Sequence, residues 1–515
     1  MATWPTNPIL YEINTVVWLE ELTRELGHPL TLADIPDSVW ADLAKTGFTA
    51  IWLMGVWERS PESIRVSSEN TNLQREFRMA LPDFVPEDNI GSAYAVHQYK
   101  VDTRLGGNEA LRVLRDQLHV HNLKLILDFV PNHLARDHPW VDENPEYFIH
   151  GSAADLVGSN GAFFESNQQI FAHGKDPHFP PWQDTVQMNL FDPGTRLESA
   201  RILDEMATLC DGIRCDMAML CINRIFAQTW GGLAGEIPAH EYWVDVISST
   251  NITHPGFIFL AEAYWGTEEE LLKLGFDACY DKVLYDILLN GSSNDLLSKL
   301  SLNTPPFSGL VHFIENHDEP RVRTAFPARR EVLGAIAITT TPGVKLIHEG
   351  QMDGRRVRIP VFLSRRPVEQ PDPNRQSFYR TLLRIASSPL IHEGEWQICT
   401  RLGWDGNPSF QNLSAWSWHD QDETLVVVLN FSEHPSQGLI LLPWEDLEGY
   451  QWKLVDLIKG NAFQRDGGEI VRQGLFVDLP GWDFHLLWCS ARNALPNSEQ
   501  TQPKDHSGVL TNGGK

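Results

Sequence analysis

The sequence lacks the cysteine patterns of a zinc site. Its six cysteines follow no CxxC or Cys/His ligand spacing, so we expect no zinc centre. Several lie in apolar runs, such as Cys215 in "GIRCD" and Cys489 in "LLWCS", which is typical of buried free thiols. Free thiols fit a reducing compartment, and we predict a cytoplasmic location.

Long apolar runs and positive charge are also scarce. No run approaches the roughly 18 apolar residues that a transmembrane helix needs, and the N-terminal "MATWPTNPIL" lacks the basic and apolar regions of a signal peptide. Lys and Arg total 41 against 68 Asp and Glu, a net charge of −27. This balance disfavours nucleic-acid phosphates and anionic membranes as partners, so we predict neither. The oligomeric state stays open.

Short apolar runs alternate with amphipathic segments from the start of the chain to about residue 385. Six runs are continuously apolar, as in parallel strands covered on both faces: 49–56, 124–133, 211–219, 256–265, 309–318 and 343–351. Segments with helical periodicity lie between them, at 108–122, 195–210 and 329–340. This strand–helix repetition predicts an α/β fold, a (β/α)8 TIM barrel.

Two regions depart from this repetition. Between "FVPNH" and the helix near Thr195 lies a segment rich in Gly, Pro, Asn and aromatic residues, which is too long for an ordinary loop. From about residue 395, short strands are separated by turns, a pattern typical of an antiparallel β-sandwich. We therefore predict a catalytic barrel over residues 1–390 with an inserted domain at 134–195, a C-terminal β-sandwich at 395–492, and a disordered tail at 493–515.

Polar side chains follow four of the predicted strands at their carboxyl ends. In a parallel barrel these ends meet at one opening, where functional side chains lie. Burying such charges one by one is costly, whereas a shared cleft can accommodate them. The residues concerned are Asp128, Asn132, His133, Arg214, Asp216, Glu262, His317 and Asp318.

The four segments "DFVPNH", "GIRCD", "LAEAYW" and "ENHD" resemble, in order and spacing, the conserved regions of glycoside hydrolase family 13, the α-amylase family. The inserted domain falls where that family carries domain B. The resemblance covers residues 1 to about 490. It implies a retaining enzyme that cleaves α-1,4-glucosidic bonds in an α-glucan or malto-oligosaccharide, with no cofactor required for the chemistry.

The resemblance assigns roles to three acids. Asp216 would be the nucleophile that forms a glycosyl–enzyme ester, Glu262 the general acid and base, and Asp318 a ligand of sugar hydroxyls that favours a distorted ring. A retaining pair needs its carboxyl groups about 5–5.5 Å apart, and neighbouring strand ends, roughly 4.8 Å apart, can supply that distance. Glu262 must be protonated to act as an acid, so we expect a dry environment around it.

Four further residues would complete the sugar site. Arg214 would hold Asp216 ionised, because an adjacent cation lowers a carboxylate pKa. The resemblance implies that Tyr94 stacks under the sugar ring and that His133 and His317 donate hydrogen bonds to the sugar. For a histidine such as His133 the alternative is a purely structural role.

Calcium binding is a separate expectation. The resemblance implies Asn132 and Asp184 as possible ligands of a structural calcium ion, and the alternative for Asp184 is a loop cap. Many α-amylases follow the nucleophile with a Lys-His pair, whereas this chain has Met219 and Leu220. We therefore expect an apolar acceptor side and leave calcium dependence open.

Several other charged and aromatic residues lie near the motifs, and each has an expected environment. Glu319 and Arg321 are expected to form an ion pair within their loop, and Glu315 to face either barrel packing or the cleft. Three tryptophans near strand ends could line sugar subsites or pack in the core: Trp57, Trp182 and Trp265.

Three alternative functions remain. A transglycosylase or sugar-rearranging member of the same family would use the same intermediate, because water and a sugar acceptor compete for it. An inactive carbohydrate-binding barrel is disfavoured by the three intact acids. A metal-dependent hydrolase would need more clustered ligands than His133 and His317 provide. Substrate chain length and linkage are not fixed by the sequence.

Overall fold

The computed structural model describes most of the chain. The tail predicted at residues 493–515 lies outside the described part, which comprises residues 4–158, 161–302, 306–327, 329–420, 423–444 and 447–490.

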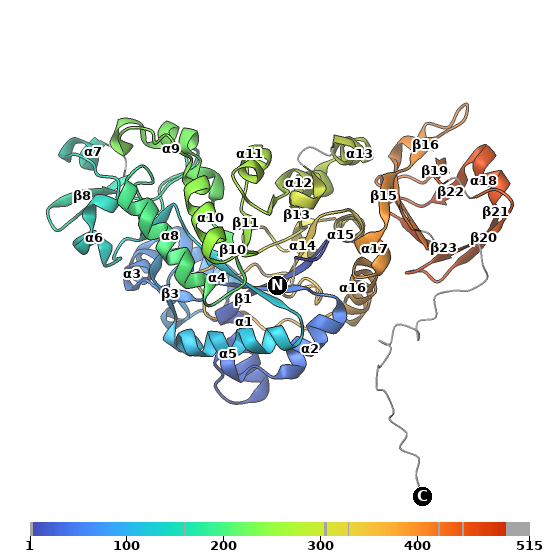
Figure 1. The fold of residues 1–515 in the computed structure, drawn as a ribbon. Coiled ribbons are helices and arrows are strands. Elements are labelled where there is room, and N and C mark those ends of the chain that lie inside the picture. Colours follow the sequence, from blue (N-terminus) through green and yellow to red (C-terminus); the bar gives the residue numbers. More distant parts are fainter. Residues whose placement is uncertain are drawn as a thin grey trace, which may run out of the picture.

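Eight parallel strands close into a barrel in chain order, which confirms the predicted fold (Figure 1). Strand β1 closes the ring by pairing with both β2 and β14. The strands are β1 (Ile9–Asn14), β2 (Ala50–Met54), β5 (Lys124–Phe129), β10 (Gly212–Cys215), β11 (Ile258–Ala261), β12 (Ala278–Tyr280), β13 (Leu310–His312) and β14 (Val344–His348).

Helices cover the outside of the barrel. A proline in the first turn and an aspartate cap start two of them: the Asp192 side chain accepts the Thr195 N–H before one helix, and Asp372 accepts the Asn374 N–H before another. The covering helices are α1 (Thr15–Leu26), α2 (Asp37–Thr46), α5 (Gly107–Val120), α8 (Pro193–Ala207), α10 (Tyr242–Thr253), α11 (Glu268–Lys273), α12 (Lys282–Asn290), α15 (Arg330–Thr340) and α16 (Pro373–Ala386). Peripheral helices are α3 (Pro61–Glu69), α4 (Thr71–Ala80), α9 (Asn223–Trp230), α13 (Ser293–Leu302), α14 (Val322–Ala325) and α17 (Pro389–Glu393).

All six apolar runs contain a barrel strand, but two further strands carry too weak a signal to be predicted. Strand β12 has only three residues, and β1 carries Glu12 and Asn14 among its apolar residues. Both pair in register with their neighbours. Barrel closure therefore creates strands that the local sequence does not indicate.

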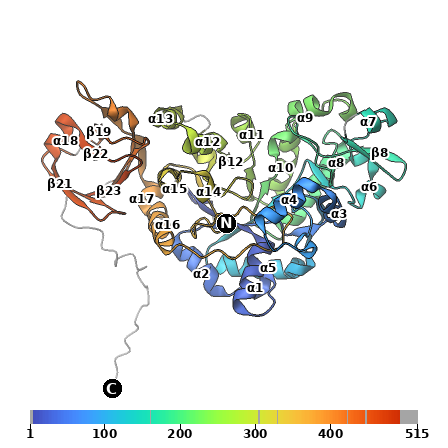
Figure 2. The same cartoon turned by 180° about the vertical axis from the view of Figure 1, so that it is seen from behind.

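The excursion between β5 and α8 forms small β-pairs beside the barrel. Strand β6 (His133–Ala135) pairs with β9 (Thr185–Gln187), so the segment leaves and returns at the same point. Figures 1 and 2 place it on the opposite side of the barrel from the C-terminal domain. Its other elements are α6 (Trp140–Glu143), α7 (Ala153–Gly158), β7 (Phe163–Ser166) and β8 (Gln169–Ala172). A separate hairpin of β3 (Trp57–Arg59) and β4 (Val96–Val101) follows β2.

The C-terminal region consists of two antiparallel sheets around a second hydrophobic core. It is attached to the barrel through Trp416 and Trp418, whose indole N–H groups both donate to Thr340 of α15. The larger sheet contains β15 (Glu395–Ile398), β17 (Leu413–His419), β18 (Thr424–Asn430), β23 (Phe484–Ser490), β20 (Gln451–Asp456) and β21 (Ala462–Asp466). The smaller contains β16 (Thr400–Leu402), β19 (Ser436–Leu441) and β22 (Leu475–Leu479), and α18 (Gly467–Gln473) precedes β22.

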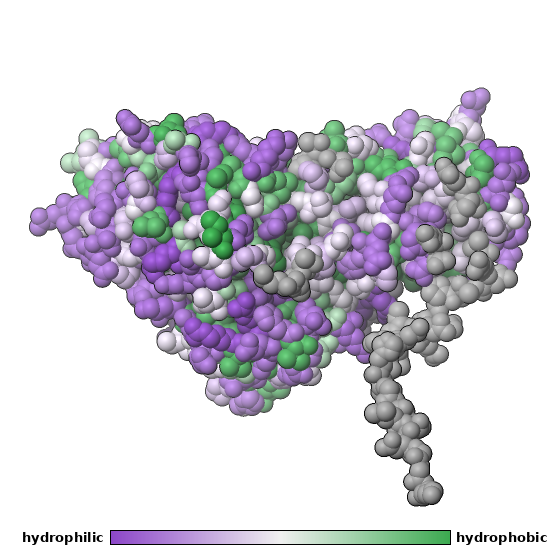
Figure 3. Space-filling model, in the orientation of Figure 1, coloured by the Kyte–Doolittle hydropathy of each residue, from purple (hydrophilic) through white to green (hydrophobic). Residues whose placement is uncertain are grey.

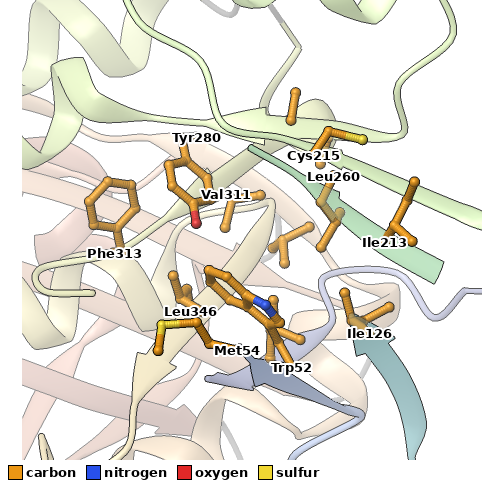
Figure 4. Packing of buried hydrophobic residues seen from close by; sticks show 14 of the residues in the cluster. Trp52, Met54, Ile126, Ile213, Cys215, Leu260, Tyr280, Val311, Phe313 and Leu346 are labelled. Carbon is orange, nitrogen blue, oxygen red and sulfur yellow. The ribbon is translucent and has the colours of Figure 1, made fainter. Parts of the chain in front are cut away.

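Large side chains fill the barrel. Trp52 of β2 is fully buried and lies among hydrophobic side chains from neighbouring strands, including Tyr280 and Leu346 (Figure 4). The face of the molecule seen in Figure 3 is mainly hydrophilic, with scattered hydrophobic side chains. Within the described ranges, no helix is both long and apolar enough to cross a membrane.

One buried cation in the barrel wall has a neutral partner. Lys345 of β14 is fully buried, and its ammonium group donates to the Gly343 carbonyl at 2.8 Å. Burial lowers the pKa of Lys345 to about 7. The unfolded chain therefore binds more protons than the folded one between about pH 7 and 10, and stability rises with pH across that window.

Lys345→Met is expected to stabilise the protein at pH 7 by on the order of 2 kcal/mol, since each pKa unit corresponds to about 1.4 kcal/mol and the lost hydrogen bond offsets part of the gain. The advantage should shrink by pH 10. Denaturant unfolding at both pH values measures this, with Lys273→Met, at an exposed surface lysine, as the control. An advantage that does not change with pH would contradict the assignment.

Candidate active site

The ends of β10 and β11 bring two of the predicted acids together. Asp216 directly follows β10, and its N–H donates to the Phe129 carbonyl at 2.8 Å. Glu262 directly follows β11, and its N–H donates to the Cys215 carbonyl at 3.0 Å. These bonds extend the barrel ladder past the strand ends, so both side chains are held on rigid backbone.

A cleft of about 340 Å³ opens at these strand ends. That volume lies in the range of small-molecule sites. Several predicted site residues line it, together with groups that sequence reasoning did not select. The lining residues are Ser92, Tyr94, His133, Trp182, Asp184, Thr185, Asp216, Met217, Glu262, Tyr264, Asp318, Val361 and Phe362.

Arg214 lies behind the cleft wall and joins its carboxylates. Its side chain is 1% exposed. Nη1 contacts Asp216 Oδ1 at 3.0 Å and Asp128 Oδ1 at 3.4 Å, while Nη2 contacts Glu262 Oε2 at 2.6 Å. One guanidinium therefore holds Asp216 and Glu262 side by side, as its planar donor fork allows.

The pKa of Asp216 is shifted upward, opposite to our expectation. Burial, followed by the nearby Glu262, raises the pKa of Asp216 to about 8, although Arg214 works in the opposite direction. Arg214 therefore acts on the pKa of Asp216 in the predicted direction, but burial and Glu262 outweigh it.

Glu262 is dry, as predicted, at 3% exposure. Its Oε2 accepts bonds from Arg214 and from the Met217 N–H at 2.7 Å, and its Oε1 is 3.0 Å from the Tyr264 hydroxyl. Guanidinium and backbone N–H groups can only donate, whereas a tyrosine hydroxyl also accepts. Among these contacts, Tyr264 is therefore the group that can accept a hydrogen bond from Glu262 in its acid form.

Tyr264→Phe is expected to lower kcat on a malto-oligosaccharide by about fivefold to tenfold, the value of roughly one hydrogen bond. The loss should nearly vanish on a 4-nitrophenyl malto-oligosaccharide, whose leaving group needs little protonation. Steady-state kinetics on both substrates makes the comparison. An equal loss on both would show that the hydroxyl does not act through the acid.

Asp318 and His317 form an ion pair that continues to an acid of β1. His317 Nε2 is 2.9 Å from Asp318 Oδ2, and Nδ1 is 2.5 Å from Glu12 Oε1. Burial disfavours charge on the imidazole, but Asp318 and Glu12 raise the pKa of His317 to about 10. Desolvation raises the pKa of Asp318, but the positive charge of His317 outweighs this effect, and the pKa of Asp318 falls to about 2. Asp318 is therefore an anion that faces the cleft with 44% of its side chain exposed.

Tyr94 and His133 line the cleft, whereas His317 lies behind Tyr94. The Tyr94 hydroxyl is 2.8 Å from His317 Nε2, and the two rings stack at 5.3 Å. Both ring nitrogens of His317 thus already contact protein groups. Burial lowers the pKa of His133 to about 4, so it is a neutral imidazole packed on Trp182.

The possible calcium ligands Asn132 and Asp184 each accept a hydrogen bond from a protein side chain. The Asn132 side-chain oxygen accepts from the Gln187 amide at 3.0 Å, and the Asp184 carboxylate accepts from the Ser63 hydroxyl at 2.6 Å. The described residues contain no group of three or more His, Cys, Asp or Glu side chains that could hold a metal.

The apolar residue that lines the cleft after Asp216 is not one of the two that we expected. Met219 and Leu220 are buried in the core within a short 3-10 turn. Met217 lines the cleft instead, and its backbone has a left-handed φ of 45°. A non-glycine residue in that conformation beside Asp216 marks a constrained turn of the kind that clusters at functional sites.

The loop after β13 is paired differently from the sequence expectation. Glu319 contacts Lys282 at 3.0 Å. Arg321 contacts Glu315 at 2.7 Å, and both are buried. The expected Glu319–Arg321 pair is therefore wrong, because Arg321 turns into the barrel wall, where the buried Glu315 needs a cation. Glu315 belongs to that packing and not to the cleft.

The three tryptophans occupy different environments. Trp57 is buried and donates to the Asp128 carbonyl, so it belongs to the core. Trp182 lines the cleft. Trp265 is 44% exposed, has a left-handed φ of 61°, and packs edge-on against His178 of the excursion.

Sequence reasoning missed Glu12, Met217 and Tyr264. Glu12 lies on β1. If β1 had been predicted as a strand, the expectation that functional side chains lie toward the carboxyl ends of barrel strands would have drawn attention to Glu12. Tyr264 lies two residues after Glu262, on the same side by strand alternation. Met217 carries no signal in a single sequence, because its backbone conformation brings it to the cleft.

The fold and the paired carboxyl groups define a class: TIM-barrel proteins with two adjacent acids at the strand ends. A family model described as "Alpha amylase, catalytic domain" matches residues 41–184. The match covers the part of the chain from within α2 to just before β9, so this part is similar to the catalytic domain of the α-amylase family.

Two curated relatives are similar over about two thirds of the chain. Alpha-amylase MalA of Haloarcula japonica is 22% identical over 344 residues, which is 66% of this chain and 47% of that protein. A cyclomaltodextrin glucanotransferase of Paenibacillus macerans is 24% identical over 331 residues, 60% of this chain and 42% of that protein. The chain thus spans about half the length of the curated relatives that it matches.

Solved structures share the fold at low identity. A maltogenic alpha-amylase AmyB of Thermotoga neapolitana has a TM-score of 0.67 at 17% identity, covering 94% of this chain and 99% of that one. An alpha-amylase of Geobacillus thermoleovorans has a TM-score of 0.64 at 16% identity, covering 95% and 99%.

Proposed function

We propose that the protein is a retaining glycoside hydrolase that cleaves α-1,4-glucosidic bonds in an α-glucan or malto-oligosaccharide. The observation that carries the proposal is the pair of carboxyl groups, Asp216 and Glu262, held on one guanidinium at adjacent strand ends and facing one cleft. Adjacent carboxyl groups suit a covalent intermediate, whereas an inverting pair is spaced more widely to admit a water molecule.

The mechanism follows from the charges of the site. Asp216 in its ionised form attacks the anomeric carbon, while Glu262 gives its proton to the departing glycosidic oxygen. The bond to the leaving sugar breaks and an ester to Asp216 forms. Glu262, now a carboxylate, removes a proton from water, which attacks the anomeric carbon and releases Asp216.

Asp318 supplies a fixed negative charge in the same cleft. His317 keeps it ionised, and Glu12 helps to keep His317 protonated. An anion preorganised beside the sugar stabilises the positive charge that develops on the ring in an oxocarbenium-like transition state. Because the ion pair is already formed, little reorganisation is needed during the reaction.

A second candidate is glucan transfer, in which a sugar hydroxyl replaces water as the acceptor. It is favoured by the apolar Met217 in the cleft and by the exposed Trp265, since such side chains hold a sugar face better than they order water. The cytoplasmic location is also part of our proposal, supported by six cysteines that are all unpaired and buried.

The product profile from maltoheptaose separates these functions. Hydrolysis releases one reducing end for each bond broken. Transfer produces longer and shorter oligosaccharides without a net gain of reducing ends. Binding of maltoheptaose without either product would favour the inactive barrel and contradict the proposal.

A further inference from the structure

The smaller sheet of the C-terminal domain carries a hydrophobic row on its outer face. Leu402 of β16 pairs with Leu439 of β19, which pairs with Phe476 of β22, so the three side chains stand side by side across the sheet. The alternate residues of β22, Leu475 and Val477, point into the domain core. Leu402 and Phe476 are 42% and 46% exposed, and exposed apolar side chains in register form a patch that needs an explanation.

Trp404 extends this row into the loop after β16. Its ring lies 6.2 Å from that of Phe476, and it is 44% exposed. The loop is anchored to the sheet: the Asn407 N–H donates to the Trp404 carbonyl, and the Asn407 side chain donates to the Gln437 carbonyl at 3.0 Å. The aromatic surface is therefore preformed, which lowers the entropic cost of binding. We name Leu402, Trp404, Leu439 and Phe476 the aromatic platform.

Polar groups border the platform on the next row. Gln437 pairs with Asp478 across β19 and β22, and the Gln437 amide donates to the Asp478 carboxylate at 3.1 Å. Beside β22, a cavity of about 140 Å³ is lined by Phe476 and Asp478 together with Arg465, His485 and core residues. Donors and acceptors of both charge signs thus adjoin an apolar surface.

This arrangement suits a neutral ligand with one apolar face and hydroxyl groups at its rim. A sugar ring has those properties, because its C–H faces stack on aromatic rings while its hydroxyls need hydrogen-bond partners. Mixed charge at the border disfavours a strongly charged ligand. Figure 3 shows hydrophobic side chains at the surface of the C-terminal domain near β16 and β19.

Other occupants fit less well. Three large side chains at slightly under half exposure present on the order of 300 Å², whereas a stable protein interface buries about 800 Å² on each partner. The chain's own residues 491–515 contain no aromatic residue, and their large apolar residues are Leu495, Val509 and Leu510. We therefore expect neither a second copy of the chain nor residues 491–515 to cover the aromatic platform.

We propose that the aromatic platform binds an α-glucan chain outside the catalytic cleft. The identity of the ligand rests on the proposed function, whereas the existence of the site rests on the platform. No platform residue lines the cleft, and the excursion that helps to form the cleft lies on the far side of the barrel (Figures 1 and 2). The platform holds a long substrate near the enzyme without contacting the reacting bond.

The test uses the full chain with Trp404→Ala and Phe476→Ala, singly and combined, and Tyr450→Ala as the matched control at an exposed aromatic of the same domain. Retardation in gels that contain glycogen or soluble starch measures binding to a long glucan. We expect the double variant to raise the apparent Kd at least fivefold and the control to change it less than twofold. The kcat and KM on maltotriose, which is too short to bridge both sites, should stay within twofold of wild type.

Three outcomes would contradict the proposal that the aromatic platform binds an α-glucan. Unchanged glucan retardation with normal maltotriose turnover would leave the proposed function standing and remove the site. A shift from dimer to monomer in sedimentation, without loss of glucan binding, would assign the platform to a second copy. A fall in thermal stability of the double variant, again with glucan binding intact, would assign it to residues 491–515. Lack of turnover of any α-glucan by the wild type, with retardation still dependent on Trp404 and Phe476, would support the site and count against the proposed function.

Discussion

Asp216→Asn and Glu262→Gln should each lower kcat on malto-oligosaccharides by at least about a thousandfold, because in the proposed mechanism one removes the nucleophile and the other the proton donor. The fold should survive. Ionisation of Asp216 is already opposed by burial and by Glu262, so the neutral amide should keep or raise the melting temperature. Steady-state kinetics and thermal unfolding measure the two effects.

The matched control is Glu319→Gln. This carboxylate follows Asp318 in sequence, but it pairs with Lys282 and does not line the cleft. Its activity should stay within about twofold of wild type. An active-site variant that keeps activity within about tenfold, a difference of only about 1.4 kcal/mol, would have no place in the chemistry.

Arg214→Leu should combine a large loss of activity with a loss of stability of about 3–5 kcal/mol, the usual effect of removing one partner from a buried ion pair. Asp128, Asp216 and Glu262 would then lie buried without their shared cation. Arg214→Lys should restore only part of either property, because a single ammonium cannot reproduce the fork that contacts both Asp216 and Glu262.

The pH dependence of the stability loss in Arg214→Leu follows from the upward shift in the pKa of Asp216. The folded-state pKa of Asp216 is raised, so the folded protein binds more protons than the unfolded chain, and this group's contribution to stability falls as pH rises from about 4 to 8. Without Arg214 the fall should be steeper. Denaturant unfolding of Arg214→Leu should therefore differ from wild type more at pH 8 than at pH 5.

A surface arginine provides the comparison. Arg224 is 58% exposed and pairs with Glu270, so Arg224→Leu should cost less than about 1 kcal/mol at either pH. If Arg214→Leu behaves like Arg224→Leu, the buried guanidinium does not neutralise the carboxyl groups in the way described.

The barrel and the cleft acids could be predicted from sequence because both depend on local patterns. A continuous apolar run such as 256–265 contains a buried parallel strand, and an acid at its end, Glu262, emerges at the barrel mouth. Strand β12 could not be predicted in this way, since three residues carry no periodicity and their pairing arises from closure of the ring.

Charge pairing was the least predictable part of the site. Sequence proximity suggested that Arg214 serves Asp216 and that Glu319 pairs with Arg321. The first contact forms, but Arg214 also reaches Glu262, which directly follows the next strand. The second does not form, because Arg321 reaches the buried Glu315 instead. Such pairings depend on which buried charges most need a partner, and that is known only once the chain has folded.

The central claim is that Asp216 becomes covalently glycosylated while Glu262 transfers the protons, and trapping the ester tests it most directly. With α-maltosyl fluoride as substrate, Glu262→Gln should still form the ester, since fluoride departs without an acid, but should hydrolyse it slowly. Mass spectrometry of peptides from the quenched reaction should find one maltosyl group on the peptide that contains Asp216, at that residue. A glycosyl group on another residue, or turnover by this variant with no trapped adduct, would contradict the account.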